Sequence, residues 1–326
     1  MNPRVSLILP AYNAAAYLER WFERNVFTQT LRPFEVVMVN DGSTDSTELI
    51  AKEYTSKLEV QGIRFHYRYQ INQGVGAAMD AALKLFNGDY LIWVDSDDFL
   101  SPDSIEKRVE FLEANPQYGY VRSDGFVFDN ADLKVPKGLL SGNKKTRFND
   151  RIFEDLLLEK TFCTPGCYML RVSALLKILP TRSIYHSRVG QNWQILLPMS
   201  WHYSCGYIDE PLFNYVVYPD SISHHNKTMS DILVYMGRLE AVLLNVLPQI
   251  MGLDWNHYHQ VITCKYARKR LSLAYEFKDF DLASESVSVL RSKKNLTKRD
   301  LLVLSRVRWP VLNYLARAIR KVLTPF

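Results

Sequence analysis

Tyr90-Leu-Ile-Trp-Val-Asp95-Ser-Asp97-Asp98-Phe99 is the stretch that decides the fold, because an apolar run ends there in three carboxylates. The apolar residues predict a strand buried on both faces, so the acids lie where that strand leaves its sheet. If the extended conformation continues, Asp95 and Asp97 point to the same side. Such carboxylates repel each other unless a cation or hydrogen bonds compensate, and Mg2+ or Mn2+ favours oxygen ligands of this kind. The alternative is a turn that caps the helix predicted after Ser101.

Strand and helix patterns alternate before these acids. The predicted strands span residues 5–12, 34–39, 63–69 and 90–94, and the predicted helices span 14–27, 43–58 and 74–86, with Ser43 or Thr44 capping the second. Alternation of this kind predicts an α/β fold with a mostly parallel sheet and a ligand crevice at the carboxyl ends of the strands. Polar residues follow each predicted strand: Pro10-Ala-Tyr12-Asn13, Asn40-Asp41-Gly42, Asn72-Gln73-Gly74 and Asp95-Ser96-Asp97.

The rest of the chain predicts a second region. Helices are expected over 102–114, 153–158 and 193–203, strands over 119–129 and from near Pro211, a strand joined to a helix over 167–179, and a polar loop over 130–149. From about Thr228 apolar residues recur every three or four positions with few strand signals. The predicted division is therefore an α/β domain over 1–226 and a helical, basic C-terminal region over 227–326.

The composition is that of an ordinary globular protein. The chain has 326 residues, 47% hydrophobic and 23% charged, as in ordinary globular proteins. No apolar segment is long enough to cross a bilayer and no secretory signal is apparent at the N-terminus, so a cytoplasmic location is expected. The four cysteines form no C-x-x-C pair and are expected to be core thiols.

The net charge of +5 is unevenly distributed. Residues 286–326 hold ten Lys or Arg against Asp300 alone, a net +9, which leaves −4 for everything before them. Within this tail, 310–323 places apolar residues on one helical stripe, which predicts either peripheral binding to an anionic membrane or packing on a protein surface. Nucleic acid is not expected because no recognisable binding module is present. The sequence predicts no oligomeric state.

Asn72-Gln-Gly74-Val-Gly76-Ala-Ala-Met79 invites comparison with the dinucleotide-binding fingerprint. Met79 stands where the third glycine belongs, and the expected acidic residue is missing after the next strand, so a nicotinamide Rossmann domain is excluded. The remaining prediction is a helix start whose free amides face a phosphate.

The four polar blocks together resemble the family 2 glycosyltransferases with the GT-A fold. The matching residues are Pro10-x-Tyr12-Asn13, Val39-Asn-Asp41-Gly-Ser-Thr-Asp45, Asn72-x-Gly74 and Val94-Asp95-Ser-Asp97-Asp98, over roughly residues 4–220. The resemblance implies a nucleoside-diphosphate sugar donor, UDP-linked by preference, and a saccharide or lipid-linked saccharide acceptor in polysaccharide biosynthesis. It also implies inversion at the anomeric carbon and a divalent metal.

The resemblance assigns roles residue by residue. Asp97 would bind Mg2+ or Mn2+, and the nucleotide sugar would lie against Pro10, Tyr12, Asn13, Asp41, Asn72, Gly74, Asp95 and Ser96. Where family members carry Ala-Arg-Asn after the glycine block, this chain has Ala78-Met79-Asp80. Arg188 or Arg171 is the proposed substitute for that arginine, and His224 is a second candidate for contact with the diphosphate or metal.

The residues expected on the acceptor side depart further from the family pattern. Inverting members carry Glu-Asp at a helix start, with the Asp as general base, whereas this chain has Gln191-Asn192. An amide is not a useful base, so three interpretations stay open. In the first, another carboxylate is the base, Asp124 first and Asp209 or Glu210 next. In the second, Gln191 and Asn192 orient an acceptor that loses its proton late. In the third, the protein binds nucleotide sugars or glycans without turnover.

Overall fold

The chain divides into two compact units, Met1–His225 and Asn226–Phe326. The computed structural model describes residues 4–142, 145–219 and 228–309. The first unit is an α/β domain, and the second is helical throughout its described residues. This division agrees with the change of hydrophobic period near Thr228.

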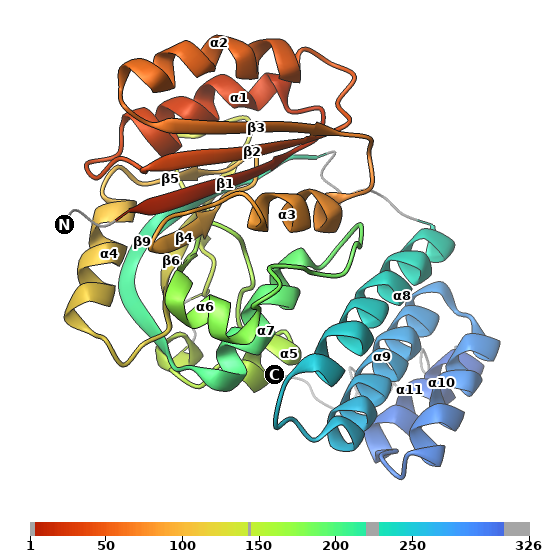
Figure 1. Ribbon diagram of the computed structural model, residues 1–326. Coiled ribbons are helices and arrows are strands. Elements are labelled where there is room, and N and C mark those ends of the chain that lie inside the picture. The colour runs from red at the N-terminus through yellow and green to blue at the C-terminus, as the bar shows by residue number, and fades with distance from the viewer. Residues whose placement is uncertain (1–3, 143–144, 220–227, 310–326) are drawn as a thin grey trace, which may run out of the picture. The chain divides into compact units, whose positions relative to one another are not determined.

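One mixed sheet organises the first unit (Figure 1). Within the described residues it has nine strands in the order β3-β2-β1-β4-β8-β6-β9-β5, and β7 pairs with β6. The strands are β1 Val5–Ala11, β2 Glu35–Asp41, β3 Arg64–Gln70, β4 Tyr90–Trp93, β5 Phe99–Leu100, β6 Tyr120–Asp129, β7 Gly138–Leu139, β8 Tyr168–Arg171 and β9 Cys205–Val217. Strands β1 to β4 are mutually parallel, whereas β8 is antiparallel to β4 and β6.

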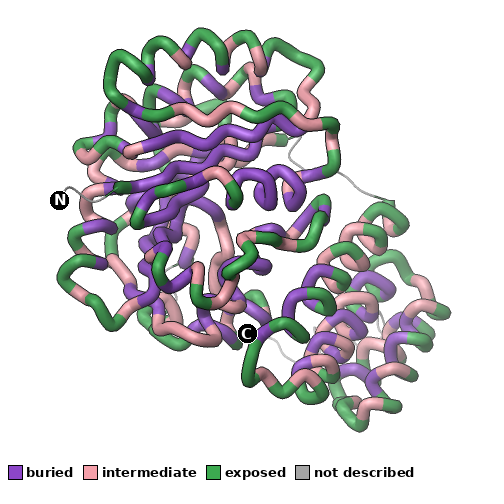
Figure 2. The backbone as a smooth tube through the Cα atoms, in the orientation of Figure 1, coloured by how far each residue is buried: buried purple, intermediate pink, exposed green. Residues whose placement is uncertain are grey.

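The apolar runs form the interior of this sheet. Every residue of β1, β2 and β4 is buried, while β3 at the sheet edge is largely half-buried or exposed (Figure 2). Continuous burial explains why the sequence shows unbroken apolar runs rather than alternation. The carboxyl ends of these strands therefore lie at one edge of a rigid layer.

Helices connect the strands. They are α1 Ala15–Phe22, α2 Thr47–Val60, α3 Val75–Leu83, α4 Ser104–Ala114, α5 Phe153–Leu157, α6 Val172–Ile178 and α7 Gln191–His202, with a π-helix η1 at Glu23–Phe27 and a 3-10 turn η2 at Lys145–Phe148. The predicted helix 14–27 therefore changes to π geometry in its last turn. The loop predicted over 130–149 contains β7 and η2.

Two local predictions were wrong. Helix α2 begins at Thr47 and is not capped by Ser43 or Thr44; instead the Asp45 carboxylate accepts the Thr47 amide at 3.0 Å. Strand β9 begins at Cys205, six residues before Pro211. Pro211 sits at an irregularity in the pairing with β6, where a missing amide does not interrupt the ladder.

Over residues 228–309 the second unit consists of four helices joined by short turns. They are α8 Met229–Val246, α9 Trp255–Phe277, α10 Phe280–Ser292 and α11 Lys298–Arg308, with a 3-10 turn η3 at Leu247–Gln249. Residues of α9, α10 and α11, including Ala267, Leu290 and Val307, form a buried cluster. Within 4–142, 145–219 and 228–309, no helix has the length and apolarity to span a membrane. The amphipathic stripe over 310–323 lies outside the described residues, so membrane binding stays a prediction.

Candidate active site

The acidic stretch turns sharply after β4. The Asp98 amide donates to the Asp95 carbonyl at 3.2 Å, which closes the turn. Asp98 itself is 2% exposed, and its carboxylate accepts the Val216 amide of β9 at 2.8 Å. Burial, together with the charges of Asp97 and Asp95, raises the pKa of Asp98 well above its usual value. Asp98 is therefore a structural joint between the turn and β9.

Asp95 and Asp97 have a different environment. Both are partly buried, and no described residue donates a hydrogen bond to the Asp95 carboxylate. Burial and the neighbouring Asp97 raise the pKa of Asp95 to about 7, and burial raises that of Asp97. Arg20 partly opposes the shift at Asp97: its Nη2 donates to the Asp97 carbonyl at 2.6 Å and to the Tyr218 hydroxyl at 2.8 Å.

This arrangement fits a divalent cation held only in part by protein. The described residues contain no group of three or more His, Cys, Asp or Glu side chains that would enclose a metal. Two carboxylates with raised pKa values nevertheless gain from a nearby positive charge. Magnesium and manganese sites often use one or two carboxylates and take their other oxygen ligands from water and substrate phosphates.

The carboxyl ends of β1 and β2 lie beside the end of β4 at one edge of the sheet, which we call the rim. Asp41, 3% exposed, accepts the Gln73 amide at 3.0 Å and the Gly74 amide at 2.8 Å, so it fixes the loop after β3. Asn13 has φ 48°, and its side-chain oxygen accepts the Thr44 amide at 2.8 Å. The predicted residues Pro10, Tyr12 and Ser96 lie at the ends of β1 and β4, with Tyr12 52% exposed.

Arg188 lies against this rim, as one of the two predicted substitutes for the missing arginine. Its Nη1 donates to the Asn72 side-chain oxygen at 3.0 Å. Gly74, at φ 94°, packs so closely that a Cβ there would lie 2.8 Å from Arg188 Cγ. Arg188 is exposed, so its guanidinium is available to an anion at the rim. His224 lies outside the described residues.

The other substitute, Arg171, is at the wrong end of the sheet. It donates to the Tyr90 hydroxyl at 3.0 Å and to the Tyr118 carbonyl at 3.1 Å. Tyr90 begins β4, whereas Asp95 follows its end. Arg171 is therefore a structural residue and cannot meet a ligand bound at Asp95.

The glycine block serves packing rather than phosphate binding by its amides. The Gly76 amide donates to the Ser187 carbonyl at 2.8 Å, and a Cβ on Gly76 would lie 2.6 Å from the Ser187 nitrogen. This helix-start amide is thus not free for a phosphate, contrary to the prediction. Asp80 secures the same segment, because it accepts the Ile184 amide at 2.8 Å and the Lys84 ammonium at 2.7 Å.

Asn192 occupies a bridge that an aspartate could not make. Its side-chain oxygen accepts the Trp93 indole N–H at 2.8 Å, and its nitrogen donates to the Cys163 carbonyl at 2.9 Å. The second bond needs a donor, which an ionised carboxylate lacks. Gln191, at the first position of α7, is 9% exposed and takes no part in this bridge. Asn192 therefore links β4 to the loop that contains Cys163.

Asp124 is poorly suited to act as the general base. It is 2% exposed, and its carboxylate accepts the Ser141 hydroxyl at 2.6 Å, the Ser141 amide at 3.1 Å and its neighbour Gly125's amide at 2.9 Å. With these donors it anchors the 138–141 segment, so the prediction that it removes a proton is not supported. Asp209 and Glu210 are exposed and form ion pairs with Arg147 and Lys107.

Comparison with known proteins identifies the first unit. Residues 6–179, more than half of the chain, match the family described as Glycosyl transferase family 2. The chain belongs to glycosyl transferase family 2. Over 104 residues this family 2 protein is 39% identical to Escherichia coli chondroitin synthase, a match that covers 32% of the chain and 14% of that enzyme. The matches cover about a third or less of the length of the curated relatives compared.

Solved structures show the same GT-A fold. S. aureus TarS 1-349 in complex with UDP has a TM-score of 0.60 at 18% identity, over 94% of this chain and 87% of that one. The mannosyltransferase PcManGT from Pyrobaculum calidifontis, in complex with GDP-Man and Mn2+, has a TM-score of 0.52 at 16% identity, over 96% and 81%. The predicted fold is thus confirmed for this family 2 protein.

Two arginines close to the candidate site residues were missed in the sequence. Arg20 lies on α1 and Arg122 on β6, and neither belongs to a polar block at a strand end. The only signal at Arg122 was a run of polar residues, Arg122-Ser-Asp124, inside a predicted strand. Arg20 gave none, because charges on a helix usually face solvent.

Proposed function

We propose that this protein transfers a sugar from a nucleoside-diphosphate sugar, UDP-linked by preference, to a hydroxyl of a saccharide or lipid-linked saccharide. Transfer proceeds with inversion and depends on Mg2+ or Mn2+. The observation that carries the proposal is the pair of poorly compensated carboxylates, Asp95 and Asp97, beside a rim fixed by Asp41. Family membership supports it, as do the UDP and the GDP-Man with Mn2+ bound by proteins of the same fold.

The rim residues divide the donor between them. Asp97 would hold the metal, Asp95 and Ser96 the sugar or ribose, and Arg188 the diphosphate. Asn72 would hold the Arg188 guanidinium in place, and Gly74 would leave room for it. Pro10, Tyr12, Asn13 and Asp41 would border the base and ribose, with Tyr12 offering an exposed ring. When bound, the cation supplies positive charge that neutralises the departing nucleoside diphosphate. Arg188 adds a second charge for the same purpose.

The acceptor hydroxyl is held rather than deprotonated in advance. Because Asn192 is committed to Trp93 and Cys163, and Asp124 to Ser141, we assign Gln191 the task of orienting the acceptor at the start of α7. The acceptor oxygen forms its bond to the anomeric carbon as the bond to the diphosphate breaks. Its proton is lost late, to water.

The second candidate is a protein that binds nucleotide sugars or glycans without turnover. The observation in its favour is that Asn192 and Asp124 both make structural hydrogen bonds, so neither is free to act as a general base. Release of nucleoside diphosphate separates the two. A panel of UDP- and GDP-sugars is incubated with the full chain, Mn2+ and a panel of saccharide acceptors.

Acceptor-dependent release that disappears in EDTA supports the transferase. Metal-dependent donor binding in a thermal-shift assay, with no release from any pair, would support the binding protein instead. Donor binding that is indifferent to both metal and Asp97→Asn would contradict the placement of the metal at Asp97.

A further inference from the structure

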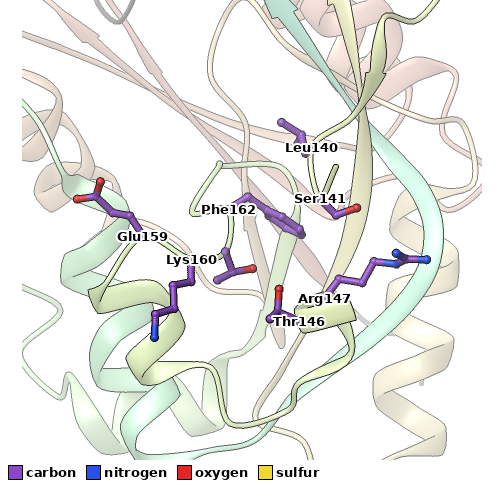
Figure 3. Close-up of a pocket in the computed structure, with 8 residues that line it drawn as sticks. Leu140, Ser141, Thr146, Arg147, Glu159, Lys160 and Phe162 are labelled. Atoms are coloured by element: carbon purple, nitrogen blue, oxygen red, sulfur yellow. The ribbon is translucent and has the colours of Figure 1, made fainter. Parts of the chain in front are cut away.

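A cavity of about 210 Å3 lies beside β6, apart from the rim around Asp41 and Asn72. Its lining residues are Leu140, Ser141, Thr146, Arg147, Glu159, Lys160, Thr161 and Phe162. Figure 3 shows the Phe162 ring among Leu140, Ser141 and Thr146, whereas Glu159 and Lys160 extend away from them. The interior surface therefore combines an aromatic ring with hydroxyl groups.

Two buried charges of β6 hold the walls of this cavity. Arg122, which is fully buried, donates to the Thr161 hydroxyl at 2.7 Å and to the carbonyls of Arg147 at 2.8 Å and Asn149 at 3.2 Å. Asp124 holds another wall, the segment at Ser141, by accepting the Ser141 amide and hydroxyl. Charges buried without an ion partner are costly unless such bonds satisfy them. The cavity is thus formed before any ligand arrives.

The register of the sheet places this cavity relative to the acids. Ile92 of β4 and Val121 of β6 both pair with Met169, so the two strands reach the same edge. Asp95 and Asp124 each come three residues later. Since β1, β2 and β3 lie on the other side of β4, the cavity and the donor rim flank Asp95 from opposite sides.

A direct chain of bonds joins the cavity to β4. Phe162 precedes Cys163, whose carbonyl accepts the Asn192 side chain at 2.9 Å. The same side chain accepts the Trp93 indole, two residues before Asp95. The position of the cavity wall is therefore fixed relative to the acidic stretch.

The cavity has groups for binding but none for reaction. Its nearest buried carboxylate, Asp124, is committed to Ser141, and Glu159 extends away from the interior. Hydroxyls around an aromatic ring suit a sugar, whose C–H face packs on the ring while its hydroxyls exchange hydrogen bonds. The volume is below the roughly 300–1,000 Å3 of a complete small-molecule site, so it fits one unit of a larger ligand.

Building on the proposed function, we propose that this cavity binds a second saccharide unit of the acceptor, next to the unit that receives the sugar. The protein would therefore select acceptors of two or more units over a monosaccharide. Thr146 and Phe162 would contact the bound unit. The Thr146 side chain is half-buried and makes no hydrogen bond within the described residues, which leaves its hydroxyl for the ligand.

The test compares acceptor length in the full chain. Defined mono-, di- and trisaccharides that support turnover are assayed in the wild type, Thr146→Trp, which fills the cavity, Thr146→Val, which removes only the hydroxyl, and Thr181→Trp at an exposed control site. The expected result is a fall of about tenfold or more in acceptor KM from one unit to two. Thr146→Trp abolishes that gain, Thr146→Val reduces it, and Thr181→Trp keeps it.

Two further readouts keep this result apart from the proposed function. Donor KM and acceptor-independent release of nucleoside diphosphate should be unchanged in Thr146→Trp, because the donor rim is untouched. Binding of the same saccharides on a glycan array needs no turnover and is expected to weaken only in the Thr146 variants. Equal KM values for all lengths, or array binding that Thr146→Trp leaves intact, would overturn the proposal even for an active enzyme.

Discussion

Asp95 and Asp97 after β4 and Arg122 and Asp124 on β6 are charges placed near the same edge of one sheet, but their surroundings differ. The β6 pair is almost fully buried and surrounded by hydrogen-bond partners from the 138–149 and 159–163 segments. The β4 pair is partly buried, with raised pKa values and few partners. Charge that is bound by several protein partners holds the structure together, whereas charge left largely uncompensated is available to a ligand.

The largest effect expected from this comparison is at Asp97. Asp97→Asn should lower kcat/KM by about 10²–10³-fold, because it removes the charge that would hold the cation beside the departing group. The unfolding midpoint should change little. Steady-state release of nucleoside diphosphate against Mn2+ concentration measures the first, and thermal unfolding the second.

Asp98→Asn is the matched control for that change. It should change the unfolding midpoint little, because the neutral asparagine oxygen can still accept the Val216 amide in the buried turn, and activity per folded molecule should persist. Metal dependence lost in Asp98→Asn but retained in Asp97→Asn would reverse the assignment of the two acids.

A large stability effect is expected at Arg122. Arg122→Met should reduce the free energy of unfolding by about 2–4 kcal/mol, because it removes a fully buried donor and leaves the Thr161 hydroxyl and the carbonyls of Arg147 and Asn149 without it. Urea unfolding measures this, with exposed Arg151→Met as the control. A loss no greater than that of Arg151→Met would contradict the contrast between the two strands.

Arg188 should have a smaller, purely functional effect. Arg188→Met is expected to raise donor KM about tenfold, equivalent to about 1.4 kcal/mol, because one charged contact to the diphosphate is lost. Acceptor KM should not change. Exposed Arg291→Met on α10 serves as the control, and equal donor KM values in the two variants would remove Arg188 from the donor site.

The smallest expected effect is at Asp80 and depends on pH. Burial alone would raise the pKa of Asp80, but hydrogen bonds from Lys84, the Ile184 amide and His186 outweigh it and lower the pKa. A carboxylate with a lowered folded pKa stabilises the protein above its unfolded value near 4, and that stability is lost as pH falls through the folded pKa. Asp80→Asn should therefore cost about 1 kcal/mol at pH 7.

The same variant should cost much less in strong acid, where wild-type Asp80 is itself protonated. Chemical unfolding at a series of pH values from neutral to acid gives the two curves. A difference between wild type and Asp80→Asn that stays constant down to strong acid would show that the ionised carboxylate is not the stabilising form.

The sequence predicted the parallel strands of the sheet well, and the physical reason is local. Buried parallel strands give unbroken apolar runs, and their polar ends mark the rim directly, as at Asp41 and Asp95. The predicted strands 5–12 and 90–94 differ from β1 and β4 by one residue at most. In these strands the residue pattern along the chain is enough to show which residues lie inside the sheet and which lie at its edge.

The surroundings of Asp124 and Asn192 could not be predicted in the same way. Whether Asp124 is a free base or an anchor depends on Ser141, and whether Asn192 is vestigial or structural depends on Trp93 and Cys163. These partners lie 17 to 99 positions away in the chain. The amides of the glycine block were misjudged for the same reason, since Ser187 occupies the space in front of Gly76.

The contact between Arg188 and Asn72 also constrains how the chain can be made. The two residues are 116 positions apart, and the segment before Arg188 packs directly on Gly74 and Gly76. At about 5–20 residues per second, a ribosome needs roughly 6–23 s to add that length. For most of this interval the nascent chain already carries its acidic stretch but not the arginine that completes the rim. A polypeptide released early would therefore display an incomplete rim with exposed glycines and unbalanced negative charge.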